Sequence, residues 1–306
     1  MAQIAARTEV GLDHILKEID DLGLTSYIED LDTNGYTVIP PEIANPNDLA
    51  QRVLDASLNV AERRNGERPD LKDGNSRNPK SPVGDAHKAI LLENQVFQDA
   101  LMNPVLLAVS TYLCGYDVVL SSMSSQMKGP SDTRFLLHTD TRLPSPLPRL
   151  PLLCKCIYAL TDFDRERGCT AFVPGSHKWD RNPEGSETII HKGGSVETVP
   201  AEGAAGSLII FHGSTWHGAY NRVVPGLRAS LHLLMMRSIL RMTEDFYDRI
   251  PEEILARNSA RFAILTQQAI IPAYLDQEDE HAKVMRSLKY TDAFEKESGI
   301  ALPVKR

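Results

Sequence analysis

The chain has 306 residues, with 33 Lys and Arg against 41 Asp and Glu, and a formal net charge of −8. At 42% hydrophobic and 24% charged residues it has the composition of a globular protein, and its acidity disfavours nucleic acid as a partner, because phosphates attract Lys and Arg. No segment approaches the roughly 18 apolar residues of a membrane helix, and the N-terminus lacks the layout of a secretory signal. Four cysteines are too few for a disulfide scaffold in a chain of this length. We therefore expect a soluble, cytoplasmic protein that binds neither nucleic acid nor a membrane.

The first sixth of the chain carries the whole net charge, since residues 1–50 hold ten acidic and two basic residues. Apolar residues at helical spacing predict a helix over Asp13–Leu22, and a second short helix follows. An Asn-Gly turn then precedes a strand over Tyr36–Ile39. A longer helix is predicted over Asp48–Arg64, with Asn47 as its N-terminal cap.

A long loop is predicted next, because residues 65–84 are polar and rich in proline and glycine. Loops of this length are lids or binding loops, or else disordered segments, and both interpretations stay open. Two more helices are expected between Asn94 and Cys114.

From Val118 onward, short apolar segments alternate with turn signals, which predicts a β-rich region. Four prolines within residues 143–151 exclude a helix or a central strand there. The predicted strands are Val118–Met127, Arg134–His138, Leu152–Phe163, Thr170–Val173, Ser195–Val199, Ser207–His212 and Leu227–Met236. Helices return over Asp245–Asn258 and about Glu278–Ser287.

Regular short strands of this kind indicate a sandwich, a jelly roll or a barrel, so the predicted fold class is mainly β with flanking helices. We expect a single domain over residues 1–306. Helices and a first strand occupy residues 1–117, a β core occupies residues 118–240, and further helices occupy residues 241–306.

His138 and Asp140 flank Thr139 at the end of a predicted strand. Residues i and i+2 of a strand point to the same side, so this imidazole and this carboxylate can face one ion. With nine histidines and 41 acidic residues, about one such triplet is expected by chance, and the motif alone is weak. In the alternative interpretation Asp140 caps the following turn and His138 only packs.

A second histidine signal lies about eighty residues later, where a predicted strand runs through His212 into a glycine turn and His217. One more histidine would complete a 2-His-1-carboxylate set, which binds Fe(II) on one face and leaves positions open for oxygen chemistry. His212 and His217 both compete for this place, and each can equally be an ordinary packed histidine.

Arg228 follows His217 by eleven residues. If the predicted strands Ser207–His212 and Leu227–Met236 are adjacent, Arg228 lies beside the strand that carries the ligand. A guanidinium binds a carboxylate through two parallel bonds, which suits a small dicarboxylate whose other end chelates a metal. The alternative is an arginine in a surface salt bridge.

Taken together, these segments resemble the phytanoyl-CoA dioxygenase family of Fe(II)/2-oxoglutarate oxygenases. The resemblance rests on HTD at 138–140, PGSH at 174–177 and WHGAYN at 216–221 with Arg228, and it extends to GYTVIP at 35–40 and to residues 168–178. It covers about residues 35–240, and it is specific as a set although no single motif is decisive.

The resemblance implies a double-stranded β-helix of the jelly-roll, cupin-like type, with its catalytic core in residues 118–240. It also implies iron on His138, Asp140 and His217, and it favours His217 over His212. 2-Oxoglutarate would chelate the metal and reach Arg228, assisted by Ser230, Thr170 and Gln126. Family members use O2 to convert 2-oxoglutarate to succinate while they oxidise a substrate C–H bond, most often by hydroxylation.

Two other interpretations of the residues stay open. One is a cupin-like metal enzyme that does not use 2-oxoglutarate and does not need Arg228. The other is a ligand-binding jelly roll without catalysis. The expected substrate is a small organic molecule, for which a natural-product intermediate and a CoA thioester are both candidates. A homodimer is the candidate assembly.

Overall fold

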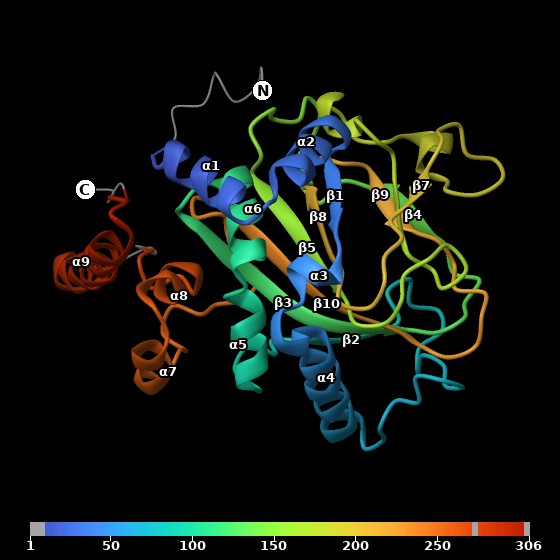
Figure 1. Ribbon diagram of the computed structural model, residues 1–306, viewed down its shortest axis with the longest axis horizontal. Helices are drawn as coiled ribbons and strands as arrows, with labels where there is room; N and C mark the ends of the chain where they lie inside the picture. Colours follow the sequence, from blue (N-terminus) through green and yellow to red (C-terminus); the bar gives the residue numbers. More distant parts are fainter. Residues whose placement is uncertain (1–9, 271–274, 303–306) are drawn as a thin grey trace.

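The computed structural model describes residues 10–270 and 275–302, whose strands form two antiparallel sheets (Figure 1). The larger sheet has six strands in the order β1-β8-β5-β10-β3-β2, and the smaller has four in the order β4-β9-β6-β7. The strands are β1 (Tyr36–Ile39), β2 (Asp85–Lys88), β3 (Val118–Lys128), β4 (Phe135–His138), β5 (Leu153–Ala159), β6 (Thr170–Phe172), β7 (Val199–Pro200), β8 (Leu208–His212), β9 (His217–Ala219) and β10 (Arg228–Arg237).

Helices cover the outer face of the larger sheet. In Figure 1 the N-terminal helices lie beside this sheet, with α6 crossing its strands, and α7, α8 and α9 gather toward one end. The helices are α1 (Leu12–Asp21), α2 (Thr25–Asn34), α3 (Pro41–Ala44), α4 (Leu49–Asn65), α5 (Gln95–Leu101), α6 (Pro104–Cys114), α7 (Glu252–Arg257), α8 (Ala260–Leu265) and α9 (Gln277–Ser298). The predicted fold class, mainly β with flanking helices, is confirmed.

Both faces of the larger sheet are buried, which explains its apolar central strands. In β8, Leu208 and Ile210 pack outward into the cluster beneath the helices, whereas Ile209 and Phe211 pack inward toward the smaller sheet. A strand that is buried on both faces has an uninterrupted apolar sequence, and residues 208–211 have such a sequence. The inner space between the sheets is where the polar residues of interest converge.

Helix α4 begins differently from the prediction. Asn47 is not its cap, because this residue has a left-handed φ of 52° and lies two residues before the helix. Asp48 directly precedes the helix, but its side chain makes no capping hydrogen bond. Asn45 performs this role instead, because its side-chain oxygen accepts the N–H of Ala50 at 2.7 Å. The kink at Pro46–Asp48 displaces the capping side chain by two residues.

Several predicted strand limits were wrong. The predicted strand Ser195–Val199 is reduced to β7, which begins at Val199, and the predicted strand Leu152–Phe163 ends at Ala159. Two short strands, β2 and β9, were not predicted. β2 has the sequence DAHK and lacks an apolar alternation, so only its pairing with β3 makes it a strand.

The C-terminal helices also differ from the prediction. The proposed helix Asp245–Asn258 is broken by Pro251, and only α7 forms beyond this residue. Helix α8 was not predicted. Helix α9 extends well past the predicted end at Ser287, and its start is fixed by Asp276, whose carboxylate accepts two N–H groups of the first turn.

The two segments that were predicted to be loops form no helix or strand of their own. Residues 66–84 have neither helix nor strand before β2, and residues 143–151 have none either. Among the described residues, no helix is both long enough and apolar enough to cross a bilayer.

Candidate functional site

Strand pairing brings His138 and His217 together. His138 ends β4, His217 opens β9, and the two are direct partners in the register of these strands, with ring centroids 4.3 Å apart. Asp140 follows two residues after His138, and its backbone N–H donates to the Gly213 carbonyl at 2.8 Å, which fixes the turn. Its carboxylate oxygens lie 3.9 Å from Nε2 of His138 and 3.7 Å from Nε2 of His217.

Backbone carbonyls set the tautomer of both imidazoles. Nδ1 of His138 lies 2.9 Å from the Leu136 carbonyl, and Nδ1 of His217 lies 3.0 Å from the Thr215 carbonyl. A carbonyl can only accept, so each Nδ1 carries the proton and each Nε2 is left as a bare acceptor. This is the arrangement by which backbone groups orient metal-binding histidines.

Three acceptors therefore converge without a donor between them. The ligand atoms of His138, Asp140 and His217 all lie within 4.8 Å of one another, and Oδ2 of Asp140 is buried with no hydrogen-bond partner among the described residues. Lone pairs facing one another across this space repel unless a cation lies between them. Two imidazoles and one carboxylate suit a divalent metal such as Fe(II), so the residues present fit the metal that the sequence predicts.

The charges around these three residues favour metal binding. Burial acts to raise the pKa of the Asp140 carboxyl, but the charges of Lys155, His217, His138 and Arg142 outweigh burial and leave this pKa below its ordinary value. Burial lowers the pKa of His217 to about 4. At neutral pH the carboxylate is therefore ionised and the His217 imidazole is neutral, which are the forms that bind a metal.

The three residues open on a cavity of about 510 Å³ between the two sheets. Of the other predicted site residues, Gln126 on β3, Thr170 on β6 and Arg228 on β10 also line it. Ser230 is fully buried, and its hydroxyl is hydrogen-bonded to Nε2 of His232 at 2.9 Å. His232 itself lines the cavity, so Ser230 contributes to the wall through this ring.

Arg228 lies at one end of this cavity, 5% exposed. Its Nη1 donates to the Gly168 carbonyl, and the guanidinium stacks over the Phe163 ring at 4.9 Å. Its Nε has no hydrogen-bond partner among the described residues. Burial lowers the pKa of Arg228 to about 10, so the side chain remains charged at neutral pH.

A second buried cation accompanies Arg228. Lys128 is its direct partner in the register of β3 and β10, and it is 1% exposed. No described residue accepts a hydrogen bond from its Nζ. Burial, assisted by the charge of Arg228, lowers the pKa of Lys128 to about 8. Two buried cations without a carboxylate partner are costly, and an anion bound beside them would remove much of this cost.

The route by which Arg228 reaches the cavity differs from the prediction. Strands β8 and β10 are not adjacent, because β5 lies between them. Arg228 instead starts the strand next to β3, and its guanidinium contacts Gly168, just before β6 of the smaller sheet.

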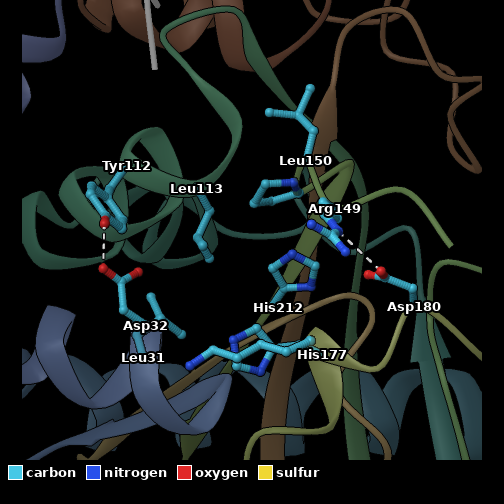
Figure 2. A pocket seen from close by; sticks show the side chains of 11 residues that line it. Leu31, Asp32, Tyr112, Leu113, Arg149, Leu150, His177, Asp180 and His212 are labelled. Carbon is cyan, nitrogen blue, oxygen red and sulfur yellow. Dashed lines mark hydrogen bonds and ion pairs between the residues drawn. The ribbon is translucent and has the colours of Figure 1, made fainter. Parts of the chain in front are cut away.

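His212 does not join the other two histidines. Its Nδ1 accepts the N–H of Ser214 at 2.9 Å, and its ring lies 5.5 Å from that of His177. Figure 2 shows these two rings together in a second cavity, beside residues of α2 and α6 such as Asp32 and Tyr112. The structure thus separates the two candidates that the residues alone left open, and it places His217 beside His138.

Sequence reasoning missed three polar residues of this region. His232 and Lys155 line the cavity, and Lys128 lies beside Arg228. The period of two along a strand was the available signal, since His232 follows Arg228 by four residues and Lys128 follows Gln126 by two. Using this signal required knowing which strands are neighbours.

The chain is similar in sequence to known dioxygenases. The profile of the family described as phytanoyl-CoA dioxygenase (PhyH) matches residues 31–229. Dioxygenase af480 of Aspergillus fumigatus is 26% identical over 163 residues, which cover 52% of this chain and 50% of that protein. The multifunctional dioxygenase prhA of Penicillium brasilianum is 34% identical over 104 residues, covering 34% of this chain and 35% of that protein. The first of these matches spans about half the length of the relative.

Solved structures share the fold. HygX from Streptomyces hygroscopicus, with nickel and 2-oxoglutarate bound, superposes with a TM-score of 0.57 at 14% identity, covering 71% of this chain and 88% of that chain. The α-ketoglutarate-dependent carbocyclase SnoK from nogalamycin biosynthesis gives a TM-score of 0.54 at 20% identity, covering 70% of this chain and 83% of that chain. These likenesses support the double-stranded β-helix.

The family profile extends over more than half of the chain, from α2 to the start of β10, and it includes His138, Asp140, His217 and Arg228. The resemblance seen in the sequence is therefore confirmed: the chain belongs to the phytanoyl-CoA dioxygenase (PhyH) family.

Proposed function

We propose that this protein is an Fe(II)/2-oxoglutarate-dependent dioxygenase that hydroxylates a C–H bond of a small organic molecule. The observation that carries the proposal is one cavity with two complementary features. Three acceptor atoms converge at His138, Asp140 and His217, and the buried cation Arg228 lines the same cavity with Lys128 as its register partner on β3. Neither cation is paired with a carboxylate among the described residues.

The metal would be held by Nε2 of His138, Nε2 of His217 and the carboxylate of Asp140. When bound with 2-oxoglutarate, Fe(II) supplies the activation of O2, which is coupled to decarboxylation of the cosubstrate to succinate and CO2 and to oxidation of the substrate. The chain keeps the Nδ1 protons of both histidines on backbone carbonyls, so both Nε2 lone pairs stay directed at the metal.

2-Oxoglutarate would be recognised at its far carboxylate by Arg228, with Lys128 as a second positive charge. The Gly168 carbonyl and the Phe163 ring orient the guanidinium before the ligand arrives. Thr170 and Gln126 offer further hydrogen bonds from the walls, and Ser230 orients His232. Such pre-ordered donors lower the entropic cost of binding a small diacid.

The substrate would enter the same cavity between apolar side chains. Phe135, Ile157 and Phe211 line it, and the rings of Phe135 and Phe211 lie against His138 and His217, where they would keep water away from the reacting bond. Two of the structural neighbours are described as enzymes of nogalamycin biosynthesis, which supports a natural-product intermediate as the kind of substrate.

The experiment is aerobic incubation of the protein with Fe(II), 2-oxoglutarate and ascorbate, with succinate as the readout. We expect succinate that depends on both Fe(II) and 2-oxoglutarate. Arg228→Gln separates this function from that of a cupin-like metal enzyme. Loss of 2-oxoglutarate binding with retained metal binding supports the proposal, and unchanged 2-oxoglutarate binding contradicts the assigned role of Arg228.

A further inference from the structure

The wall of the cavity carries an excess of positive charge that 2-oxoglutarate does not explain. Besides Arg228, the wall includes Lys155, Lys88 and Arg142. Apart from the metal-binding carboxylate, Glu244 is the one acidic residue among the described residues that line this cavity. Its carboxylate already accepts two backbone N–H groups, at 3.0 and 3.2 Å. The wall is therefore cationic.

Lys155 is the most informative of these residues, because it lies inside the fold. It is half-buried in the middle of β5, where its neighbours in the register are Leu234 of β10 and Phe211 of β8. It points to the inner face together with Ile157 of the same strand, and both line the cavity. It forms no hydrogen bond or ion pair with any residue in the described part of the chain.

Asp140 does not account for Lys155 once a metal is bound. A divalent cation on the three acceptors would more than balance the single charge of Asp140. With the chelating carboxylate of 2-oxoglutarate added, the centre would be neutral, so no net negative charge there would remain for Lys155. A half-buried ammonium group in this position is unfavourable unless another anion lies nearby.

The anion that Arg228 binds does not also neutralise the charge of Lys155. Along β10, Arg228 and Leu234, the partner of Lys155, are six residues apart, which puts their Cα atoms about 20 Å apart at a rise of roughly 3.3 Å per residue. The five-carbon chain of 2-oxoglutarate spans only about 6 Å between its ends. The Gly168 contact also fixes the Arg228 guanidinium, and His232 lies between Arg228 and Leu234 along β10.

We infer that the substrate is an organic acid whose carboxylate binds Lys155, with Arg142 and Lys88 at the rim of the cavity. The inference rests on the proposed function, since it assigns this end of the cavity to the substrate. The acid must carry an apolar body, because Leu153, Leu234 and Met236 line the same end. A carboxylate there would place its hydrocarbon portion against these side chains and beside the metal.

The test compares decanoate with decanamide, which have the same length and differ in charge. Their affinities are measured by calorimetry on the full chain loaded with Ni(II), with and without saturating 2-oxoglutarate. We expect decanoate to bind at least about tenfold more tightly than decanamide, since a charge-assisted bond is worth this much. Lys155→Met should remove the preference, and Lys155→Arg should retain it.

Lys296→Met is the matched control, because it removes the same charge from an exposed position on α9. It should keep the preference. The inference is overturned by equal affinities for the two probes, by no measurable binding of decanoate, by a preference that survives in Lys155→Met, or by displacement of decanoate with 2-oxoglutarate. If 2-oxoglutarate itself fails to bind, the proposed function fails, while the comparison of the two probes still tests Lys155.

Discussion

Replacement of Lys128 by methionine should make the free protein more stable and at the same time a poorer binder of 2-oxoglutarate. Lys128 is 1% exposed and lies beside the Arg228 charge without a hydrogen-bond acceptor among the described residues. Burial lowers its pKa from 10.5 to about 8. A shift of this size corresponds to about 3 kcal/mol of destabilisation at neutral pH, because each unit is worth about 1.4 kcal/mol.

The pH dependence follows from the direction of the shift. Below pH 8 the lysine is protonated in both the folded and the unfolded chain, and the full cost of the buried charge is present. Between pH 8 and pH 10.5 the unfolded chain holds a proton that the folded chain has released, so the stability of the wild-type protein rises with pH. The advantage of Lys128→Met should therefore fall from about 3 kcal/mol at neutral pH to about half of this near pH 9.5.

Urea unfolding at both pH values measures this difference, and calorimetry measures 2-oxoglutarate binding. We expect binding to weaken by about tenfold in Lys128→Met, because one of two positive charges near the far carboxylate is lost. The exposed control Lys296→Met should change stability by no more than about 0.5 kcal/mol. A Lys128→Met protein that is less stable than the wild type, or that binds 2-oxoglutarate equally well, would refute this reasoning.

Three further substitutions test other parts of the account. Asp140→Asn should weaken Fe(II) binding by at least about 100-fold in equilibrium dialysis, and an unchanged affinity would mean that the metal binds elsewhere. Gly218→Ala should also weaken metal binding, since the added Cβ would lie 2.6 Å from the Phe135 carbonyl oxygen and push β4 away from β9. A metal affinity equal to that of the wild type would show that the two strands tolerate this Cβ. Asn45→Ala should lower the free energy of unfolding by about 1 kcal/mol in urea through loss of the α4 cap, with metal binding retained, and no change in stability would count against the cap.

The sequence was most informative where structure depends on local pattern. Strand β1 has the predicted limits, and β3 and β8 come within one residue of theirs. β8 is a continuous apolar run up to His212, and β3 opens with Val118, Val119 and Leu120, so both have a clear apolar signal. His138 and Asp140 could be paired from the sequence alone, since the period of a strand puts residues i and i+2 on one side.

What depends on strand order could not be predicted in the same way. Strand β9 has three residues, and only its pairing with β4 and β6 defines it. The choice between His212 and His217 was left open by the residues themselves, and it was the family resemblance that favoured His217. The roles of Lys128 and Lys155 depend on which strands lie beside theirs, since Lys128 pairs with Arg228 and Lys155 pairs with Leu234 and Phe211.

The most direct test of the central claim is succinate formation by the wild-type protein beside His138→Ala and Asp140→Asn, with Fe(II), O2 and 2-oxoglutarate supplied. We expect Fe(II)-dependent succinate from the wild type and a loss of at least about 100-fold in both variants, because one lacks an imidazole ligand and the other lacks the carboxylate charge. Succinate formation that persists in the variants, or a wild-type protein that binds Fe(II) and 2-oxoglutarate yet forms no succinate with any substrate, would contradict the central claim.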